Sequence, residues 1–292
     1  MSAKVVALAG ANGFVGKAFA NAFLGVNAFQ LRILTRASSV DSEPLQEYKS
    51  RGASLYPVSY EDEASITKAL EGVDVLVSAV AGSALVSAQV PLVKAAKAAG
   101  VKTFFPSEYG SINTRPSQLF EDESNPSPVI QGKKTVIKAA KEAGLPITGL
   151  STGGFPEYCF IPPFGYAFAE KKVTVWGDGN AKSTWTTVRS VADWLANVLK
   201  TVPVEQFQNK HLRIQGNAAS VNEVVKLWEQ KHNAKLEVEY RPLKELDDRV
   251  KADVNDLLAV LLQEWSSGRG EIGGKDNGLY PGWKPEPIES VL

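Results

Sequence analysis

Short apolar runs alternate with amphipathic segments through the first half of the chain. The runs are rich in β-branched and aromatic residues, as buried strands are, and they occupy residues 5–9, 31–34, 53–56, 73–77, 103–105 and 147–150. Helical patterns fill the intervals at residues 14–23, 44–51, 66–70, 87–99 and 129–143, and glycines at 52, 72, 100 and 144 end four of them. Alternation of this kind is typical of an α/β fold, so we expect a doubly wound parallel sheet of six strands with helices on both faces.

The regular alternation ends after Leu150. Aromatic and proline-rich segments follow, then a turn at residues 177–180, a helical pattern at 191–200 and two further helix candidates after Val221 and Pro242. We therefore expect a first domain at residues 1–152 and a smaller C-terminal α+β region at 153–292, and interleaving of the two stays open. The polar stretch at 111–127 is the most loop-like part of the chain, either as solvated surface or as a lid over an active site.

Composition excludes several classes of function. The chain is 44% hydrophobic and 22% charged, ordinary for a globular protein, and 32 Lys and Arg balance 32 Asp and Glu. A net charge of zero offers no basic excess for a nucleic acid or an anionic membrane, and a small-molecule partner fits better. The single cysteine, Cys159, cannot form an intramolecular disulfide, and the two histidines, His211 and His232, are too far apart in sequence to indicate a metal site.

The N-terminal sequence and the lack of a clear membrane span favour a cytoplasmic location. The N-terminus runs directly into the first apolar run, without the charged start, long apolar stretch and cleavage site of a secretory signal. Residues 75–93 are uncharged, but Gly82, Gln89 and Pro91 lie among them. We interpret this segment as a strand, a turn and a buried helix, and not as a membrane span.

A glycine-rich turn joins the first strand to the first helix. It reads Gly-Ala-Asn-Gly-Phe-Val-Gly at residues 10–16, with a Gly-x-x-Gly-x-x-Gly spacing that differs from the Gly-x-Gly-x-x-Gly of many dehydrogenases. Glycines allow a tight turn and a close backbone approach, and a helix N-terminus offers free N–H groups to a pyrophosphate. A plain structural turn is the alternative. The expected fold is thus of the Rossmann type, and the candidate cofactor contacts in the turn are Gly10, Asn12, Gly13, Phe14, Val15 and Gly16.

Arg36 stands at the end of the second strand, where an NAD-binding enzyme would carry an acidic residue for the ribose 2′-hydroxyl. A guanidinium can instead hold a 2′-phosphate through charge-assisted hydrogen bonds, with Ser38 or Ser39 as helpers. Arg36 could equally be an ordinary surface arginine. We predict NADP(H) as the cofactor in preference to NAD.

Two adjacent lysines in the helical segment 129–143 have different neighbours. Around Lys133, the residues three and four positions away are all apolar, whereas those around Lys134 are mixed. Lys133 therefore points into the packed face, where a lysine needs a partner or a cavity. It is either an acid–base group or a lysine whose ammonium reaches water past the helix start. A Tyr-x-x-x-Lys pair at Tyr240 and Lys244 is interrupted by Pro242, so we regard it as a coincidence.

These residues resemble the NmrA-like and isoflavone-reductase-like branch of atypical short-chain dehydrogenases. The resemblance covers essentially the whole chain. It is carried by the glycine turn, by Thr35-Arg36, by Phe-Pro-Ser-Glu-Tyr-Gly at 105–110, and by Lys133 with Ala-Gly-Leu-Pro at 143–146. Tyr-Pro-Gly-Trp-Lys-Pro at 280–285 is also similar to fungal members.

The resemblance implies a Rossmann domain that binds NADPH and a C-terminal region that shapes an apolar substrate pocket. It assigns the family's catalytic lysine, which also borders the cofactor, to Lys133. Ser-Thr-Gly-Gly-Phe at 151–155 corresponds to the segment that lines the nicotinamide, which makes Gly154 and Phe155 candidate cofactor contacts. Plant enzymes usually carry an Asn-containing string there, so this departure puts the substrate in question. Ala81, after the fourth strand, completes the predicted cofactor set.

Aromatic residues gather between positions 155 and 168, and core packing explains most of them. We expect Phe155 and Tyr158, with Tyr109, to contact the substrate. The resulting prediction is an NADPH-dependent reductase of a small apolar or aromatic, phenylpropanoid-like substrate. The alternative is a non-catalytic NADP(H)-binding redox sensor that regulates a protein partner. A filled cleft and an exposed apolar patch would favour the sensor.

Overall fold

A parallel sheet forms the centre of the N-terminal half. The computed structural model describes residues 1–80, 82–110, 128–253 and 255–292. Within these ranges five strands pair in the order β3-β2-β1-β4-β5, every pair parallel. Their bounds are β1 Val5–Ala9, β2 Gln30–Thr35, β3 Ser54–Pro57, β4 Val75–Ser78 and β5 Thr103–Phe105. The expected α/β class and doubly wound topology are confirmed, and the strand order reverses between β1 and β4, where such sheets bind ligands.

The sixth predicted strand is attached more loosely. β6 covers Gly149–Ser151, and just before it the Thr148 N–H donates to the Phe104 carbonyl oxygen at 2.8 Å. A single parallel bridge between Phe104 and Ile147 joins this segment to β5. β10, at His211–Arg213, then pairs in parallel with β6. In place of the predicted six-stranded sheet, five strands are thus joined by continuous hydrogen-bond ladders, and β6 with β10 lies beside β5.

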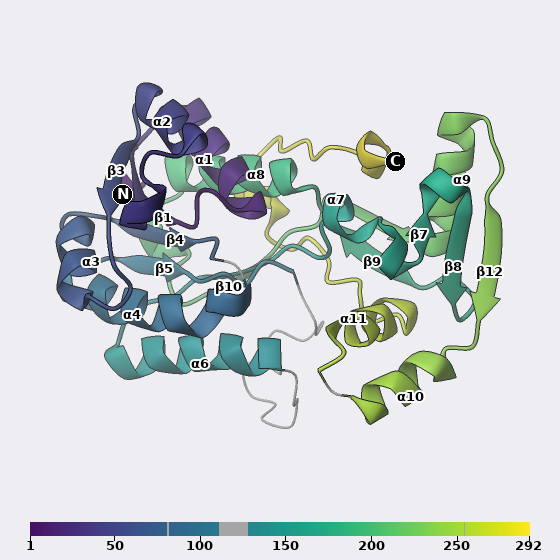
Figure 1. Cartoon of the computed structure of the whole chain (residues 1–292). Coiled ribbons are helices and arrows are strands. Elements are labelled where there is room, and N and C mark those ends of the chain that lie inside the picture. The colour runs from purple at the N-terminus through teal and green to yellow at the C-terminus, as the bar shows by residue number, and fades with distance from the viewer. Residues whose placement is uncertain (81, 111–127, 254) are drawn as a thin grey trace.

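Helices cover both faces of the sheet (Figure 1). Side chains of α1, α2 and α8 enter one buried cluster, and side chains of α3, α4 and α6 enter the other. The bounds are α1 Phe14–Val26, α2 Glu43–Ser50, α3 Glu63–Leu70, α4 Leu85–Ala98, α6 Pro128–Ala143 and α8 Val188–Thr201. Glycines 52, 72, 100 and 144 adopt positive φ just after four of the predicted helices, as the sequence indicated.

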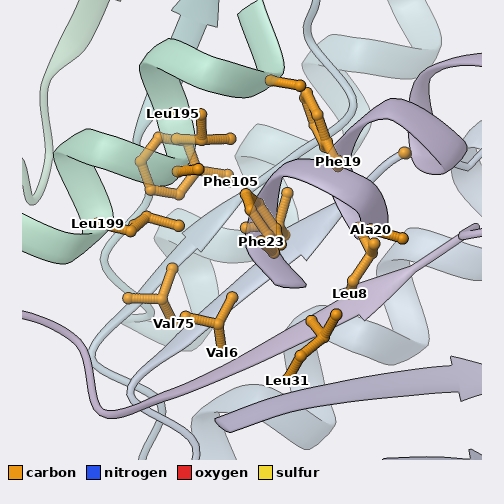
Figure 2. Close-up of a cluster of buried hydrophobic side chains, with 14 of the residues drawn as sticks. Val6, Leu8, Phe19, Ala20, Phe23, Leu31, Val75, Phe105, Leu195 and Leu199 are labelled. Atoms are coloured by element: carbon orange, nitrogen blue, oxygen red, sulfur yellow. The ribbon is translucent and has the colours of Figure 1, made fainter. Parts of the chain in front are cut away.

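The core between the sheet and α8 fixes the position of α1. Figure 2 shows Phe19 and Phe23 of α1 between Leu8 of β1 and the α8 residues Leu195 and Leu199. The two phenylalanine rings stack at 5.7 Å, and both side chains are fully buried. Burial of a large apolar side chain stabilises the fold by about 1.5–3 kcal/mol. Because this packing holds α1 rigidly, the first turn of the helix stays at the carboxyl end of β1.

The C-terminal region adds small sheets and helices on the right of Figure 1. Strands β12, β8 and β7 form one sheet, and β11 pairs with β9. The strands are β7 Tyr166–Ala167, β8 Lys172–Trp176, β9 Lys182–Trp185, β11 Asn217–Ser220 and β12 Glu237–Arg241. The helices are α7 Pro156–Cys159, α9 Val221–His232, α10 Lys244–Ala252 and α11 Leu257–Ser266. Of these helices, α9 and α10 match the sequence expectation, whereas α11 was not expected.

Elements from beyond residue 152, α8 and β10 among them, pack with the first part of the chain. α8 contributes Val191, Leu195 and Leu199 to the core that holds α1, and β10 extends the strand β6. The chain thus returns to the N-terminal sheet before it builds the rest of the C-terminal region. The boundary at residue 152 itself stays a prediction.

The uncharged segment 75–93 comprises β4, a 3-10 turn at Gly82–Ala84 and the first part of α4, as the sequence analysis expected. Across the described ranges, none of the helices has both the length and the apolar character needed to cross a bilayer.

Candidate functional site

The glycine turn brings the backbone of β1 and α1 close together. Gly10 adopts φ +87°, and a Cβ there would lie 2.6 Å from the Ala79 carbonyl oxygen. A Cβ on Gly16 would overlap the Gly10 carbonyl oxygen. The Gly13 N–H donates to the Gly10 carbonyl oxygen at 3.0 Å. Gly13 directly precedes α1, and no side chain caps the N–H groups of its first turn. Only glycine fits at positions 10 and 16, and the first N–H groups of α1 stay open to a ligand.

A cavity of about 470 Å³ lies against this turn, and we call it the nucleotide cavity. It is formed by the glycine turn, the ends of β2 and β4, and the start of α4. Its lining residues are Gly10, Ala11, Asn12, Gly13, Ile33, Leu34, Thr35, Arg36, Ser39, Leu45, Tyr60, Glu61, Ala79, Val80, Ala84, Ser87 and Ala88. The Asn12 side-chain amide donates to the Ser42 hydroxyl at 3.1 Å, which ties the turn to the start of α2.

Arg36 borders the nucleotide cavity directly after β2. Its side chain is exposed, and it forms no ion pair with any residue in the described ranges. Tyr60 lies across the same cavity, where burial raises the pKa of its hydroxyl and the nearby Arg36 charge opposes that rise. A guanidinium without an ion-pair partner in the described ranges, next to backbone N–H groups, suits a dinucleotide that carries an additional phosphate.

A second cavity, of about 360 Å³, adjoins the first, and we call it the apolar cavity. Val80 lines both cavities, so they share a wall. Its lining residues are Phe14, Val15, Val80, Gly82, Leu85, Ser107, Tyr109, Gly110, Val129, Lys133, Gly153, Gly154, Phe155, Tyr158, Cys159, Phe164, Leu257, Leu261 and Trp265. Among the described residues, no three His, Cys, Asp or Glu side chains gather closely enough to hold a metal ion.

Lys133 supplies the charge of the apolar cavity. Its side chain is 15% exposed, and Nζ lies 3.9 Å from Oε2 of Glu108, which is itself buried. Burial raises the pKa of Glu108, and the Lys133 charge opposes that rise. Lys134 does not line the cavity. Its Nζ is also shielded, without a hydrogen-bond partner among the described residues, a burial that the helix pattern did not predict.

The segment after β5 is anchored on both sides of Glu108. The Ser107 hydroxyl donates to the Val80 carbonyl oxygen at 3.1 Å, and the Tyr109 hydroxyl donates to the Ser78 carbonyl oxygen at 2.9 Å. The Tyr109 ring packs edge-on against Phe19 at 5.0 Å. Tyr109 therefore lines the apolar cavity while its hydroxyl is bound to the end of β4, and burial raises the pKa of that hydroxyl well above its usual range.

Aromatic side chains from two distant parts of the chain meet at the apolar cavity. Phe14, at the start of α1, lies 6.1 Å from Phe155 and 6.2 Å from Tyr158, measured between ring centroids. Phe14 is 47% exposed and Tyr158 is 62% exposed, so two neighbouring aromatic side chains present apolar surface that a bound ligand would cover. Gly154 belongs to the same wall, and a Cβ there would lie 2.5 Å from the Trp185 ring.

The predicted site residues divide between the two cavities. Gly10, Asn12, Gly13 and Arg36 line the nucleotide cavity. The others that reach a cavity line the apolar one, namely Phe14, Val15, Tyr109, Lys133, Gly154, Phe155 and Tyr158. Gly16 lines neither, because its role is to let α1 approach the turn. Ala81 and the polar stretch 111–127 lie outside the described residues.

Sequence reasoning missed several lining residues. Tyr60 follows β3 without a recognisable motif. Glu108 lines neither cavity but contacts Lys133, and it was not predicted as a site residue although it lies inside the 105–110 string. Leu257, Leu261 and Trp265 of α11 have the i, i+4, i+8 spacing of one helix face, which was a readable signal. Tyr240 lies in β12 and Lys244 begins α10, so no helix carries that pair.

Comparison with known proteins identifies reductases as relatives. A phenylcoumaran benzylic ether reductase of Ginkgo biloba is 34% identical over 81% of this chain and 78% of its own length. One of Pinus taeda is 32% identical over 98% of this chain and 97% of its own length. These relatives are plant proteins, and the likeness of residues 280–285 to fungal members stays a prediction.

A solved structure and a family model also match this chain. A solved structure described as AtPrR2 with NADP+ and (+)pinoresinol superposes with a TM-score of 0.83 at 24% identity, over 100% of this chain and 98% of that one. A sequence model described as the NmrA-like family matches residues 2–276. The family resemblance inferred from the glycine turn, the 105–110 string and Lys133 is confirmed, and the chain belongs to the NmrA-like family.

Proposed function

We propose that this protein is an NADPH-dependent reductase of a small aromatic substrate of the phenylpropanoid class. The observation that carries the proposal is the shared wall at Val80 between the nucleotide cavity and the apolar cavity. A cofactor in the first and an apolar substrate in the second would meet at that wall, which is the geometry that hydride transfer needs. The reductase names of the relatives, and the NADP+ and pinoresinol of the structural neighbour, support the same class of reaction.

The residues of the nucleotide cavity would hold the cofactor. The open N–H groups at the start of α1 would bind the pyrophosphate, and the glycines at 10 and 13 would allow its close approach. Arg36 would bind the 2′-phosphate through charge-assisted hydrogen bonds. When bound, NADPH supplies the hydride.

Lys133 would handle the proton. It is the one charged side chain among the described residues that line the apolar cavity, so it faces whatever negative charge develops on the substrate. An ammonium in that position stabilises the charge and can transfer a proton at Nζ. Phe14, Phe155 and Tyr158 would pack on the aromatic ring of the substrate and orient it.

The sensor alternative has less support. It called for a filled cleft together with an exposed apolar patch. The apolar cavity has a volume of about 360 Å³ beside Lys133, and the exposed aromatic residues Phe14 and Tyr158 belong to its wall. The regulatory protein partner that this alternative implies stays a prediction. For the reductase we propose a cytoplasmic location, because the free Cys159 and a reaction that consumes NADPH suit a reducing compartment.

The test is a turnover assay with the purified protein. Aromatic carbonyls and phenylpropanoid-like benzylic ethers and alkenes are incubated with NADPH, oxidation of NADPH is followed by absorbance, and products are identified by mass spectrometry. We expect at least one substrate to be reduced, with NADPH strongly preferred to NADH. Tight NADPH binding without turnover of any compound would favour the sensor, and no binding of either coenzyme would refute both functions.

A further inference from the structure

We propose that Glu108 is a positioning residue for the reaction: its carboxylate holds the Lys133 side chain in the wall of the apolar cavity and stabilises the charge of its ammonium there. The inference rests on the proposed function, because it takes Lys133 as the group that transfers the proton. Glu108 does not line the cavity, so it would act on the substrate only through Lys133.

The geometry of Glu108 suits a fixed counter-charge. Its side chain is 6% exposed, and Oε2 lies 3.9 Å from Nζ of Lys133. The hydroxyls of its two neighbours in sequence, Ser107 and Tyr109, bond to the backbone at the end of β4. The backbone that carries Glu108 is therefore anchored independently of Lys133, and the shorter, buried carboxylate side chain limits where the longer lysine side chain can place its ammonium.

A buried carboxylate needs a reason to be there. Burial of an ionised side chain is costly unless an opposite charge compensates it, and replacement of such a pair by apolar residues often stabilises a protein. Glu108 has no hydrogen-bond partner for its carboxylate in the described part of the chain, and Lys133 forms its one ion pair there. The buried ion pair is thus expected to add little to the stability of the fold. A role in holding the Lys133 ammonium explains its presence better.

Three titratable groups near Lys133 are uncharged at neutral pH. Burial raises the pKa of Cys159 to about 12 and raises that of Tyr109 well above its usual range. His211 on β10 interacts with Lys133, and burial, followed by the charges of Arg213 and Lys275, lowers its pKa to about 4. Among the groups that face Lys133 in the described ranges, Glu108 is therefore the counter-charge of the Lys133 ammonium.

Removal of this counter-charge should destabilise the ammonium relative to the neutral amine. An opposite charge at this separation shifts a titration by about one to three pH units. In Glu108→Gln, the Lys133-dependent limb of the pH profile of kcat should therefore move to lower pH by at least about one unit. The shift has the same direction whether Lys133 acts as the acid, which gives a falling limb, or as the base, which gives a rising limb. In both cases the midpoint of the limb is the pH at which half of Lys133 is protonated.

A second readout works without turnover. Competitive labelling with acetic anhydride, followed by mass spectrometry of the peptide that contains Lys133, reports the fraction of unprotonated amine at each pH. Glu108→Asp keeps the charge but draws it back by one methylene, so its midpoint should lie between those of the wild type and Glu108→Gln. Glu142→Gln is the matched control, since Glu142 pairs with Lys138 on the exposed face of the same helix as Lys133.

The outcomes separate this inference from the proposed function. A midpoint that is lower in Glu108→Gln, intermediate in Glu108→Asp and unchanged in Glu142→Gln supports the positioning role, even if no substrate is reduced and the proposed function fails. Equal labelling midpoints in the wild type and Glu108→Asp, or in the wild type and a folded Glu108→Gln, would overturn it, even if the wild type proves to be an active reductase. Thermal unfolding of each variant establishes whether it folds.

Discussion

The two cavities are built in different ways. Residues of the nucleotide cavity all lie between Gly10 and Ala88, in the glycine turn, at strand ends and on the helices that follow them, and the turn itself has a backbone that only glycine permits. The apolar cavity collects side chains from Phe14 to Trp265, from elements that are adjacent only after folding. A cofactor site common to many folds can thus be encoded locally, whereas a substrate site depends on how distant elements pack.

The two cavities also differ in chemistry. The nucleotide cavity offers N–H groups and the guanidinium of Arg36, which suit phosphates and demand little of the neighbouring side chains. The apolar cavity offers aromatic and aliphatic surface and the ammonium of Lys133. Substitutions in the first should therefore change coenzyme affinity, and substitutions in the second should change turnover or the preference for substrate.

Lys133→Ala should have the largest effect on turnover. Loss of a group that transfers a proton lowers kcat by about 10²- to 10⁴-fold. The neighbouring variant Lys134→Ala is the matched control, because Lys134 lies one residue further along α6 and does not line the apolar cavity. Steady-state kinetics with a substrate found in the turnover assay would measure both. A Lys133→Ala enzyme with undiminished kcat would remove the lysine from the mechanism.

Arg36→Glu should have the next largest effect, confined to the other cavity. Charge-assisted hydrogen bonds are worth about 1.5–3 kcal/mol, and the new carboxylate would also repel the 2′-phosphate. We expect NADPH to bind about 100-fold more weakly and NADH to bind about as before, measured by fluorescence titration. Lys49→Glu makes the same change of charge on exposed α2 and should leave both affinities unchanged. Equal affinity of the wild type for the two coenzymes would contradict this role of Arg36.

Sequence patterns predicted most of the first half of the fold. The strands at 5–9 and 103–105 have the bounds of β1 and β5, and the glycines that follow four of the helices adopt positive φ. These features depend on local preferences, because a β-branched run, a helical period and a glycine stop each act within a few residues. The position of Lys133 on the packed face of its helix was predicted for the same reason, since its neighbours along the helix were all apolar.

Features that depend on distant packing could not be predicted in this way. The return of α8 and β10 to the N-terminal sheet leaves no local mark, and neither does the burial of Lys134. Glu108 lies in a short sequence string and belongs to no helical or strand pattern that would indicate which way its side chain points. Its ion pair with Lys133 can therefore be identified only from the three-dimensional structure. α11 had a local pattern, yet nothing in the sequence showed that its face would complete the apolar cavity.

Leu261→Ala tests that part of the site and should have the smallest effect. Leu261 is half-buried and lines the apolar cavity from α11, so its truncation removes apolar contact worth about 1 kcal/mol, or about 5-fold in KM for a substrate that fills the cavity. Because α11 contributes nothing to the nucleotide cavity, the affinity for NADPH should stay constant. The adjacent variant Val260→Ala shortens a half-buried side chain of the same helix that lines neither cavity, and it should leave KM unchanged. If both variants raise KM equally, the effect belongs to the stability of α11, and α11 does not select the substrate.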